Sequence, residues 1–230
     1  MAGQFFTPNL SRLPPPQLRL WQELGQVPSD FVLYGGTAVA LRLGHRSSVD
    51  FDFFSSQSFE PQHLKELGLL RGEGLVRFDQ DQTNTLTAVL DRGGPVKVSF
   101  LGGLQNLHRV CDPDMAAGPK IQVASLLDLA AMKLAAIQAR AAAKDYLDLE
   151  AMIQAGIDLP QGLAAARAVY GSRFDVTLSL RALRYYGDGD LNEVPDEIQR
   201  RLTGLADSVD VSKLPSLEKQ VGLSPGDQQR

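Results

Sequence analysis

The sequence predicts a mixed α/β (α+β) fold in which a strand-rich first half is followed by a helical second half. Short apolar runs bounded by glycine and proline recur up to residue 124, as in strands. From Ser125 onward the apolar spacing becomes helical, in a segment rich in alanine and leucine, which are strong helix formers. Strands followed by helices favour the α+β class, or a mixed α/β arrangement.

The expected elements follow from local apolar spacing and from the residues that interrupt it. Thr37 is suited to cap the helix after the first strand, and Gly44 to end it. Two apolar runs flanking residues 93–95 predict a hairpin. The expected strands span residues 31–34, 49–54, 85–91, 96–102 and 121–124, and the expected helices span 18–27, 38–44, 60–70, 125–144, 145–156, 160–170, 175–185 and 194–206.

The length of 230 residues suits one core domain with a helical appendage. We predict a sheet core with an N-terminal arm over residues 1–124 and a helical C-terminal part over 125–209, packed on the core. Residues 210–230 are polar with few aromatics, so we expect a frayed tail there.

Composition limits the compartment and the partners. The net charge of −4 argues against a broad nucleic-acid footprint, although a local basic groove remains compatible with it. The single cysteine, Cys111, cannot form an internal disulfide, so a reducing cytoplasm is expected. The first residues do not resemble a signal peptide, and no apolar run is long enough to predict a membrane-spanning helix.

Asp50 and Asp52 are the leading candidates for chemistry. Strand alternation places both carboxylates on one face and two phenylalanines on the other. Paired carboxylates suit Mg²⁺, or Mn²⁺, completed by substrate phosphates. Taken alone, Asp-x-Asp is common, and a solvated strand face explains it as well.

The neighbouring motif strengthens the metal hypothesis. Gly35 and Gly36 stand between a strand and a helix start, where backbone N–H groups can approach a phosphate. Arg46 and Ser47 lie between this turn and the aspartates, and we include both among the predicted nucleotide-binding residues. The order of strand, glycine turn, helix and Asp-x-Asp strand is far more specific than its parts.

A second cluster lies in the helical half. Lys133, Arg140 and Lys144 fall on one stripe if the helix runs straight, and such a stripe could hold a triphosphate. A solvated helix face is the alternative, but Lys133 lies in an apolar stretch, where a charged side chain is rarely buried unless it is paired. Asp145 and Asp148 follow, and could cap the next helix, pair with Arg46 or Arg140, or assist catalysis.

Two segments together carry a family resemblance. LYGGTAVALRLGHRSSVDFDFF and KLAAIQARAAAKDYLDL resemble the two motifs of the AbiEii/AbiGii-type abortive-infection toxins, which are nucleotidyltransferase-like proteins of type IV toxin–antitoxin systems. The resemblance covers about residues 30–155. It implies a nucleotidyltransferase fold, with a mixed sheet flanked by helices and a helical C-terminal part.

The resemblance also implies roles for single residues. Gly35, Gly36 and Thr37 would contact the triphosphate, and Asp50 and Asp52 would bind magnesium. Lys133 would reach the nucleotide phosphates, and Asp145 would be a catalytic helper. Family members are typically toxins of two-gene systems, so a cognate antitoxin is an expected partner, and some members transfer a nucleotide to tRNA.

One departure from the general nucleotidyltransferase pattern limits this prediction. A third carboxylate usually lies on a later strand, and the equivalent run here, VKVSFL, offers Lys97 and Ser99 instead. Asp79, Asp81 or Asp91 could substitute.

Three functions therefore remain open. The first is a metal-dependent nucleotidyltransferase that binds a nucleoside triphosphate and transfers nucleotide to tRNA-like RNA or to protein. The second is a catalytically degenerate nucleotide-binding or partner-binding module on the same fold. The third is a glycosyltransferase that uses Asp-x-Asp for a nucleotide sugar, which leaves the cation stripe unexplained.

Overall fold

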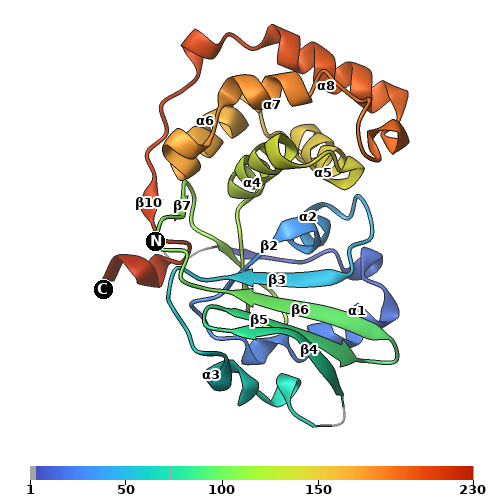
Figure 1. The fold of residues 1–230 in the computed structure, drawn as a ribbon, viewed down its shortest axis with the longest axis vertical. Coiled ribbons are helices and arrows are strands. Elements are labelled where there is room, and N and C mark those ends of the chain that lie inside the picture. Colours follow the sequence, from blue (N-terminus) through green and yellow to red (C-terminus); the bar gives the residue numbers. More distant parts are fainter. Residues whose placement is uncertain (1–3, 73, 230) are drawn as a thin grey trace. The chain divides into compact units, whose positions relative to one another are not determined.

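The computed structural model describes residues 4–72 and 74–229, and its mixed α/β architecture confirms the predicted fold class (Figure 1). The chain forms two compact units. Among the described residues, the first comprises 4–72, 74–108, 112–125 and 220–229, and the second comprises 109–111 and 126–219.

An eight-stranded mixed sheet, in the order β1-β8-β9-β2-β3-β6-β5-β4, forms the centre of the first unit. β3 pairs with β2 in antiparallel fashion and with β6 in parallel fashion. β5 and β6 form the predicted hairpin. The strands of this sheet are β1 (Phe5–Phe6), β2 (Val32–Tyr34), β3 (Asp50–Phe54), β4 (Leu75–Gln82), β5 (Thr85–Asp91), β6 (Pro95–Leu101), β8 (Asp114–Ala116) and β9 (Gln122–Val123), and a separate pair joins β7 (His108–Arg109) to β10 (Gln220–Val221).

The two faces of this sheet differ in chemistry because side chains alternate along each strand. Phe51 and Phe53 point into the core and are fully buried, as predicted. Phe53 stacks on Phe100 of β6, with ring centroids 5.4 Å apart. Asp50 and Asp52 are on the opposite face of β3 and are partly exposed, so the buried aromatics anchor the strand that presents the carboxylates.

Helix α2 lies along β2 and β3 on one side of the sheet (Figure 1). The prediction that Thr37 caps this helix is wrong, because the helix already begins at Gly35 and Thr37 is buried within it. Gly44 ends the helix in the left-handed region, at φ 63°, as predicted. The helical elements of this unit are α1 (Pro15–Trp21), α2 (Gly35–Leu43) and α3 (Pro61–Lys65), with short 3₁₀ turns η1 (Leu10–Arg12), η2 (Leu24–Gln26), η3 (Gly68–Leu70) and η7 (Pro225–Gln229).

Three strands of the sheet, β1, β4 and β8, were not expected from the sequence. β4 contains two irregularities in its pairing with β5, and most of its side chains are exposed. Such an edge strand lacks the clean apolar alternation that identifies a half-buried strand. β8 has only three residues, which is too short for a periodic signal.

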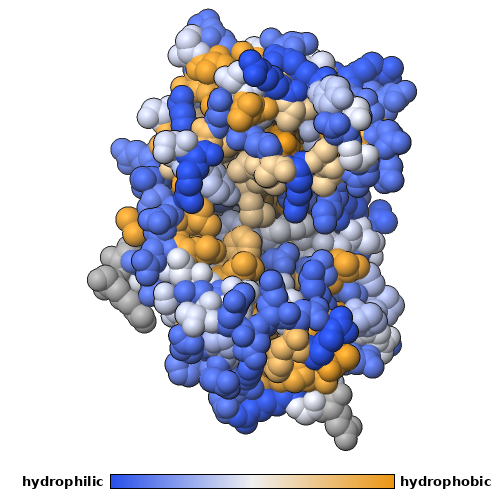
Figure 2. Space-filling view, viewed as in Figure 1, coloured by the Kyte–Doolittle hydropathy of each residue, from blue (hydrophilic) through white to orange (hydrophobic). Residues whose placement is uncertain are grey.

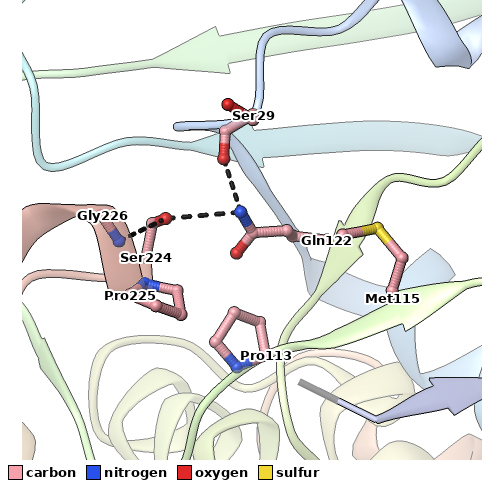
Figure 3. A pocket seen from close by; sticks show the side chains of 7 residues that line it. All are labelled: Ser29, Pro113, Met115, Gln122, Ser224, Pro225 and Gly226. Atoms are coloured by element: carbon pink, nitrogen blue, oxygen red, sulfur yellow. Dashed lines mark hydrogen bonds between the residues drawn. The ribbon is translucent and has the colours of Figure 1, made fainter. Parts of the chain in front are cut away.

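The expectation of a frayed tail over residues 210–230 is not met by residues 220–229. Residues 220–229 belong to the first unit, and those before them to the second. Leu223 and Ser224 are buried. Figure 3 shows Ser224 facing Gln122 of β9, whose amide Nε2 donates to Ser29 O at 2.5 Å and to Ser224 Oγ at 3.3 Å. Buried contacts with the sheet, rather than composition, order this segment.

The second unit is helical. Its core includes Leu129, Leu134, Leu163 and Leu180, all at most 4% exposed. The predicted continuous helix over residues 125–144 ends at Ala139, and the next begins at Ala143. The helical elements of this unit are α4 (Leu126–Ala139), α5 (Ala143–Gln154), α6 (Leu159–Tyr170), α7 (Val176–Ala182) and α8 (Asp196–Ser208), with 3₁₀ turns η4 (Gly171–Arg173), η5 (Leu191–Glu193) and η6 (Val211–Lys213).

The surface drawn in Figure 2 is mostly hydrophilic, with separate apolar patches. Within the described part of the chain, no helix is both long and apolar enough to cross a membrane.

Candidate active site

The carboxylate pair of β3 lies on a polar face of the first unit. In the sheet register, Asp52 is opposite Tyr34 of β2 on one side and Ser99 of β6 on the other. Asp50 is opposite Lys97, whose Nζ lies 3.5 Å from Asp50 Oδ2. The predicted placement of both carboxylates on one strand face therefore agrees with the structure, and a cation lies beside one of them.

The glycine turn before α2 fits closely against this pair. Gly35 has a φ of +76°, and a Cβ at this position would lie 3.0 Å from Asp52 Oδ2. A Cβ on Gly36 would lie 2.5 Å from a terminal nitrogen of Arg46. Position 35 therefore favours glycine for its backbone conformation, and a Cβ there would crowd Asp52, whereas at Gly36 the close atom is the end of the flexible Arg46 side chain. The helix N-terminus beside Asp52 is a suitable place for a phosphate.

Thr37 connects this turn to β3. Its hydroxyl donates to the backbone carbonyl of Asp50 and lies 2.9 Å from Ser48 Oγ. Because Thr37 is only 1% exposed, its side chain holds the segment before Asp50 in position. Arg46 donates from Nη1 to Ser47 O at 2.9 Å, and Ser47 is exposed.

The other predicted site residues belong to the second unit, where Lys133 lies between two buried carboxylates. Its Nζ is 2.7 Å from Asp145 Oδ1 and 2.6 Å from Asp148 Oδ2. Arg140 adds two hydrogen bonds to Asp145, from Nε at 2.7 Å and from Nη2 at 3.0 Å. The lysine side chain is 4% exposed and both aspartate side chains are fully buried.

These cations determine the charge state of Asp145. Burial alone would raise the pKa of its carboxyl, but the hydrogen bonds from Arg140 and the charge of Lys133 outweigh burial and lower that pKa. Asp145 is therefore an ionised carboxylate that accepts from two cations, an arrangement suited to orienting Lys133 and Arg140.

The predicted single stripe of cations is not observed. It required a straight helix, whereas Arg140 follows the end of α4 and Lys144 lies on α5. Lys133 faces the buried aspartates, while Lys144 is exposed and the Arg140 side chain is 55% exposed. Arg140 also lines a pocket with Tyr146, Tyr185 and other residues of this unit.

Sequence reasoning missed two contacts at these sites. It did not pair Lys97 with Asp50, because the strands that contain them are far apart in the sequence. It left the partner of Asp148 open, although the i, i+3 spacing from Asp145 puts both carboxylates on one side of a helix. A buried lysine needs such partners.

The donor set was compared with the needs of a divalent cation. Two carboxylates on one strand face fit one magnesium ion whose remaining ligands are phosphate and water. Among residues 4–72 and 74–229, no group of three or more His, Cys, Asp or Glu side chains is arranged to hold a metal. The residues therefore fit one substrate-completed ion better than an all-protein cage.

Comparison with protein families gives one extended match. The sequence matches the family described as "Nucleotidyl transferase AbiEii toxin, Type IV TA system" over residues 19–218. It is also 31% identical over 175 residues to "Uncharacterized protein aq_aa25" from Aquifex aeolicus (strain VF5). The aligned region covers 74% of this chain and 80% of that protein.

Solved structures give the same fold. MenT4, described as a nucleotidyltransferase toxin from Mycobacterium tuberculosis H37Rv, aligns with a TM-score of 0.59 and 19% identity, covering 85% of this chain and 83% of that chain. A putative nucleotidyltransferase from H. pylori aligns with a TM-score of 0.52 and 18% identity, covering 84% and 90%. At these identities the likeness concerns the fold alone.

Proposed function

The chain belongs to the AbiEii family of nucleotidyltransferase toxins of type IV toxin–antitoxin systems, and from this premise we propose that it is a metal-dependent nucleotidyltransferase with Asp50 and Asp52 as metal ligands. The observation that carries the proposal is the fit between the carboxylate pair on β3 and the glycine turn at the start of α2. A nucleoside triphosphate is the substrate, with tRNA-like RNA or a protein as acceptor and an antitoxin as cognate partner in the cytoplasm.

The first unit binds the reacting end of the triphosphate. Asp50 and Asp52 hold the divalent cation, Mg²⁺ or Mn²⁺, which when bound neutralises phosphate charge and polarises the phosphorus being attacked. The N-terminal amides of α2 receive phosphate oxygens at Gly35 and Gly36. Thr37 supports the start of α2 and the start of β3 rather than binding phosphate, because its hydroxyl already donates to the backbone carbonyl of Asp50.

The second unit contains exposed and buried cations. Arg140 and Lys144 are exposed, so they can meet phosphate oxygens or the acceptor backbone directly. Lys133 is buried, and Asp145 and Asp148 hold its ammonium in a fixed position. Asp145 is then a positioning residue for Lys133 and Arg140 rather than a proton acceptor, because a carboxylate with a lowered pKa is a weak base.

In the reaction, an acceptor hydroxyl attacks the α-phosphorus of the triphosphate. A new oxygen–phosphorus bond forms, the bond between the α-phosphorus and the bridging oxygen breaks, and pyrophosphate leaves. The hydroxyl proton passes to solvent or to a phosphate oxygen. The side chains of Asp50 and Asp52 provide oxygen ligands suited to a divalent cation.

The test is transfer of label from each of the four α-labelled nucleoside triphosphates to bacterial RNA or protein, with magnesium present. We expect Asp52→Asn to reduce transfer at least about 100-fold, as loss of a transition-state electrostatic contact does. Asp207→Asn is the matched control, because Asp207 is an exposed aspartate that pairs with Arg184 and is not a candidate for the third carboxylate. Equal transfer by wild type and Asp52→Asn would remove the proposal.

A second candidate is a degenerate module that binds a triphosphate without transferring it. Lys97 and Ser99 on β6, where a third carboxylate would otherwise be expected, favour this candidate. Calorimetry distinguishes the two, since the module predicts magnesium-dependent triphosphate binding with no labelled product from any acceptor. Labelled product that is lost in Asp52→Asn would exclude it.

A further inference from the structure

The strand beside the carboxylate pair presents a cation in the site itself. β3 and β6 pair in parallel, so Lys97 lies next to Asp50 and Ser99 next to Asp52 on the same sheet face. Lys97 Nζ is 3.5 Å from Asp50 Oδ2. Ser99 is 7% exposed and neutral. The two β6 residues beside the carboxylates, Lys97 and Ser99, therefore contribute one positive charge and no negative charge.

This charge arrangement limits how many divalent ions the site can hold. A second divalent ion in the site would lie about 3.5–4 Å from the first. Asp50, Asp52 and Lys97 together have a net charge of −1, and the described residues contain no group of three potential metal ligands. A second divalent ion beside Asp50 would meet the ammonium at a separation where like charges repel strongly.

The pair is not explained by a need for stability. The Lys97 and Asp50 side chains are 43% and 39% exposed, respectively. Exposed pairs of this kind contribute little to folding. A substitution of Lys97 is therefore compatible with a folded protein, and its effects can be measured at the site.

We propose that the Lys97 ammonium takes the place of a second divalent ion, so that the site binds a single divalent cation together with the triphosphate. Lys97 acts as a positioning and charge-compensating residue for Asp50. This inference rests on the proposed nucleotidyltransferase function and specifies its metal requirement.

The charge effect predicts the behaviour of the protein without nucleotide. Lys97→Met removes the ammonium without adding a ligand, so the net charge of the trio changes from −1 to −2. We expect Mn²⁺ to bind the variant at least about tenfold more tightly than wild type. Lys65→Met is the matched control, because Lys65 also pairs with an aspartate, Asp81, at the surface of the first unit. Unchanged Mn²⁺ affinity in Lys97→Met would contradict the inference.

The stoichiometry test uses Mn²⁺ electron paramagnetic resonance on the full chain, saturated with a non-hydrolysable triphosphate analogue. We expect one bound Mn²⁺ per complex for wild type and Lys65→Met, and two for Lys97→Glu, which replaces the ammonium by a carboxylate. Two ions in wild type, or one ion in Lys97→Glu, would overturn the inference while leaving the proposed function in place. Absence of both Mn²⁺ and analogue binding in wild type would instead contradict the proposed function, and the inference with it.

Discussion

The buried ion cluster of the second unit gives the sharpest prediction for stability. Lys133→Met removes the cation that lies between Asp145 and Asp148, at 2.7 and 2.6 Å from their oxygens. Both carboxylates are fully buried, so their charges lose a compensating partner in a poorly solvated place. Removing one member of a buried ion pair typically costs about 3–5 kcal/mol, and we expect a loss of unfolding free energy in this range.

Urea unfolding followed by far-ultraviolet circular dichroism measures this loss in the helical unit. Fluorescence of Trp21, the only tryptophan of the chain and a residue of the first unit, reports that unit separately. Lys65→Met is the control, since the Lys65–Asp81 pair is partly exposed and should contribute at most about 1 kcal/mol. In Lys133→Met combined with Asp148→Asn, part of the loss should be recovered, because the uncompensated charge is gone. A loss in Lys133→Met no larger than in Lys65→Met would refute this reasoning.

Three further predictions concern the ionisation, the turn and the C-terminal segment. Because the pKa of Asp145 is lowered in the folded state, its stabilisation is present above pH ~4 and is lost as the pH falls through the lower folded value. Urea midpoints measured against pH should show this loss in wild type and not in Asp145→Asn, and parallel profiles would contradict it. Gly35→Ala should weaken triphosphate binding in calorimetry more than Gly72→Ala does, because both glycines have positive φ but only Gly35 adjoins Asp52; equal weakening would point to backbone strain alone. Leu223→Ala should lower the Trp21-monitored stability by about 2 kcal/mol or more, since Leu223 is 2% exposed; an unchanged midpoint would show that the C-terminal segment is not part of that core.

The sequence predicted the sheet face of the first unit well, for local reasons. Alternation in β3 placed Asp50 and Asp52 together because the period of a strand is independent of its partners. The hairpin of β5 and β6 followed from two apolar runs around a glycine turn. The pairing of β3 with β6 joins segments more than forty residues apart, so no local pattern could identify Lys97 as the neighbour of Asp50.

The second unit was predicted less accurately where tertiary contacts outweigh local propensity. The run from Ser125 to Lys144 has the composition of a single helix, yet α4 ends at Ala139. Asp190 accepts from the Ala143 amide at 2.6 Å at the start of α5, a contact that a distant loop supplies. Lys133, Arg140 and Lys144 therefore do not lie on the single stripe that a straight helix would produce. Lys133 instead contacts the buried Asp145 and Asp148.

The most direct test of the central claim follows which phosphorus atom is transferred. Wild type and Asp52→Asn are incubated with α-labelled or γ-labelled triphosphate, magnesium and bacterial RNA or protein. The account predicts that wild type attaches the α-label to an acceptor and releases the γ-label in pyrophosphate, and that Asp52→Asn does neither. Attachment of the γ-label, or α-label transfer that persists in Asp52→Asn, would contradict the assignment of a nucleotidyltransferase site to Asp50 and Asp52.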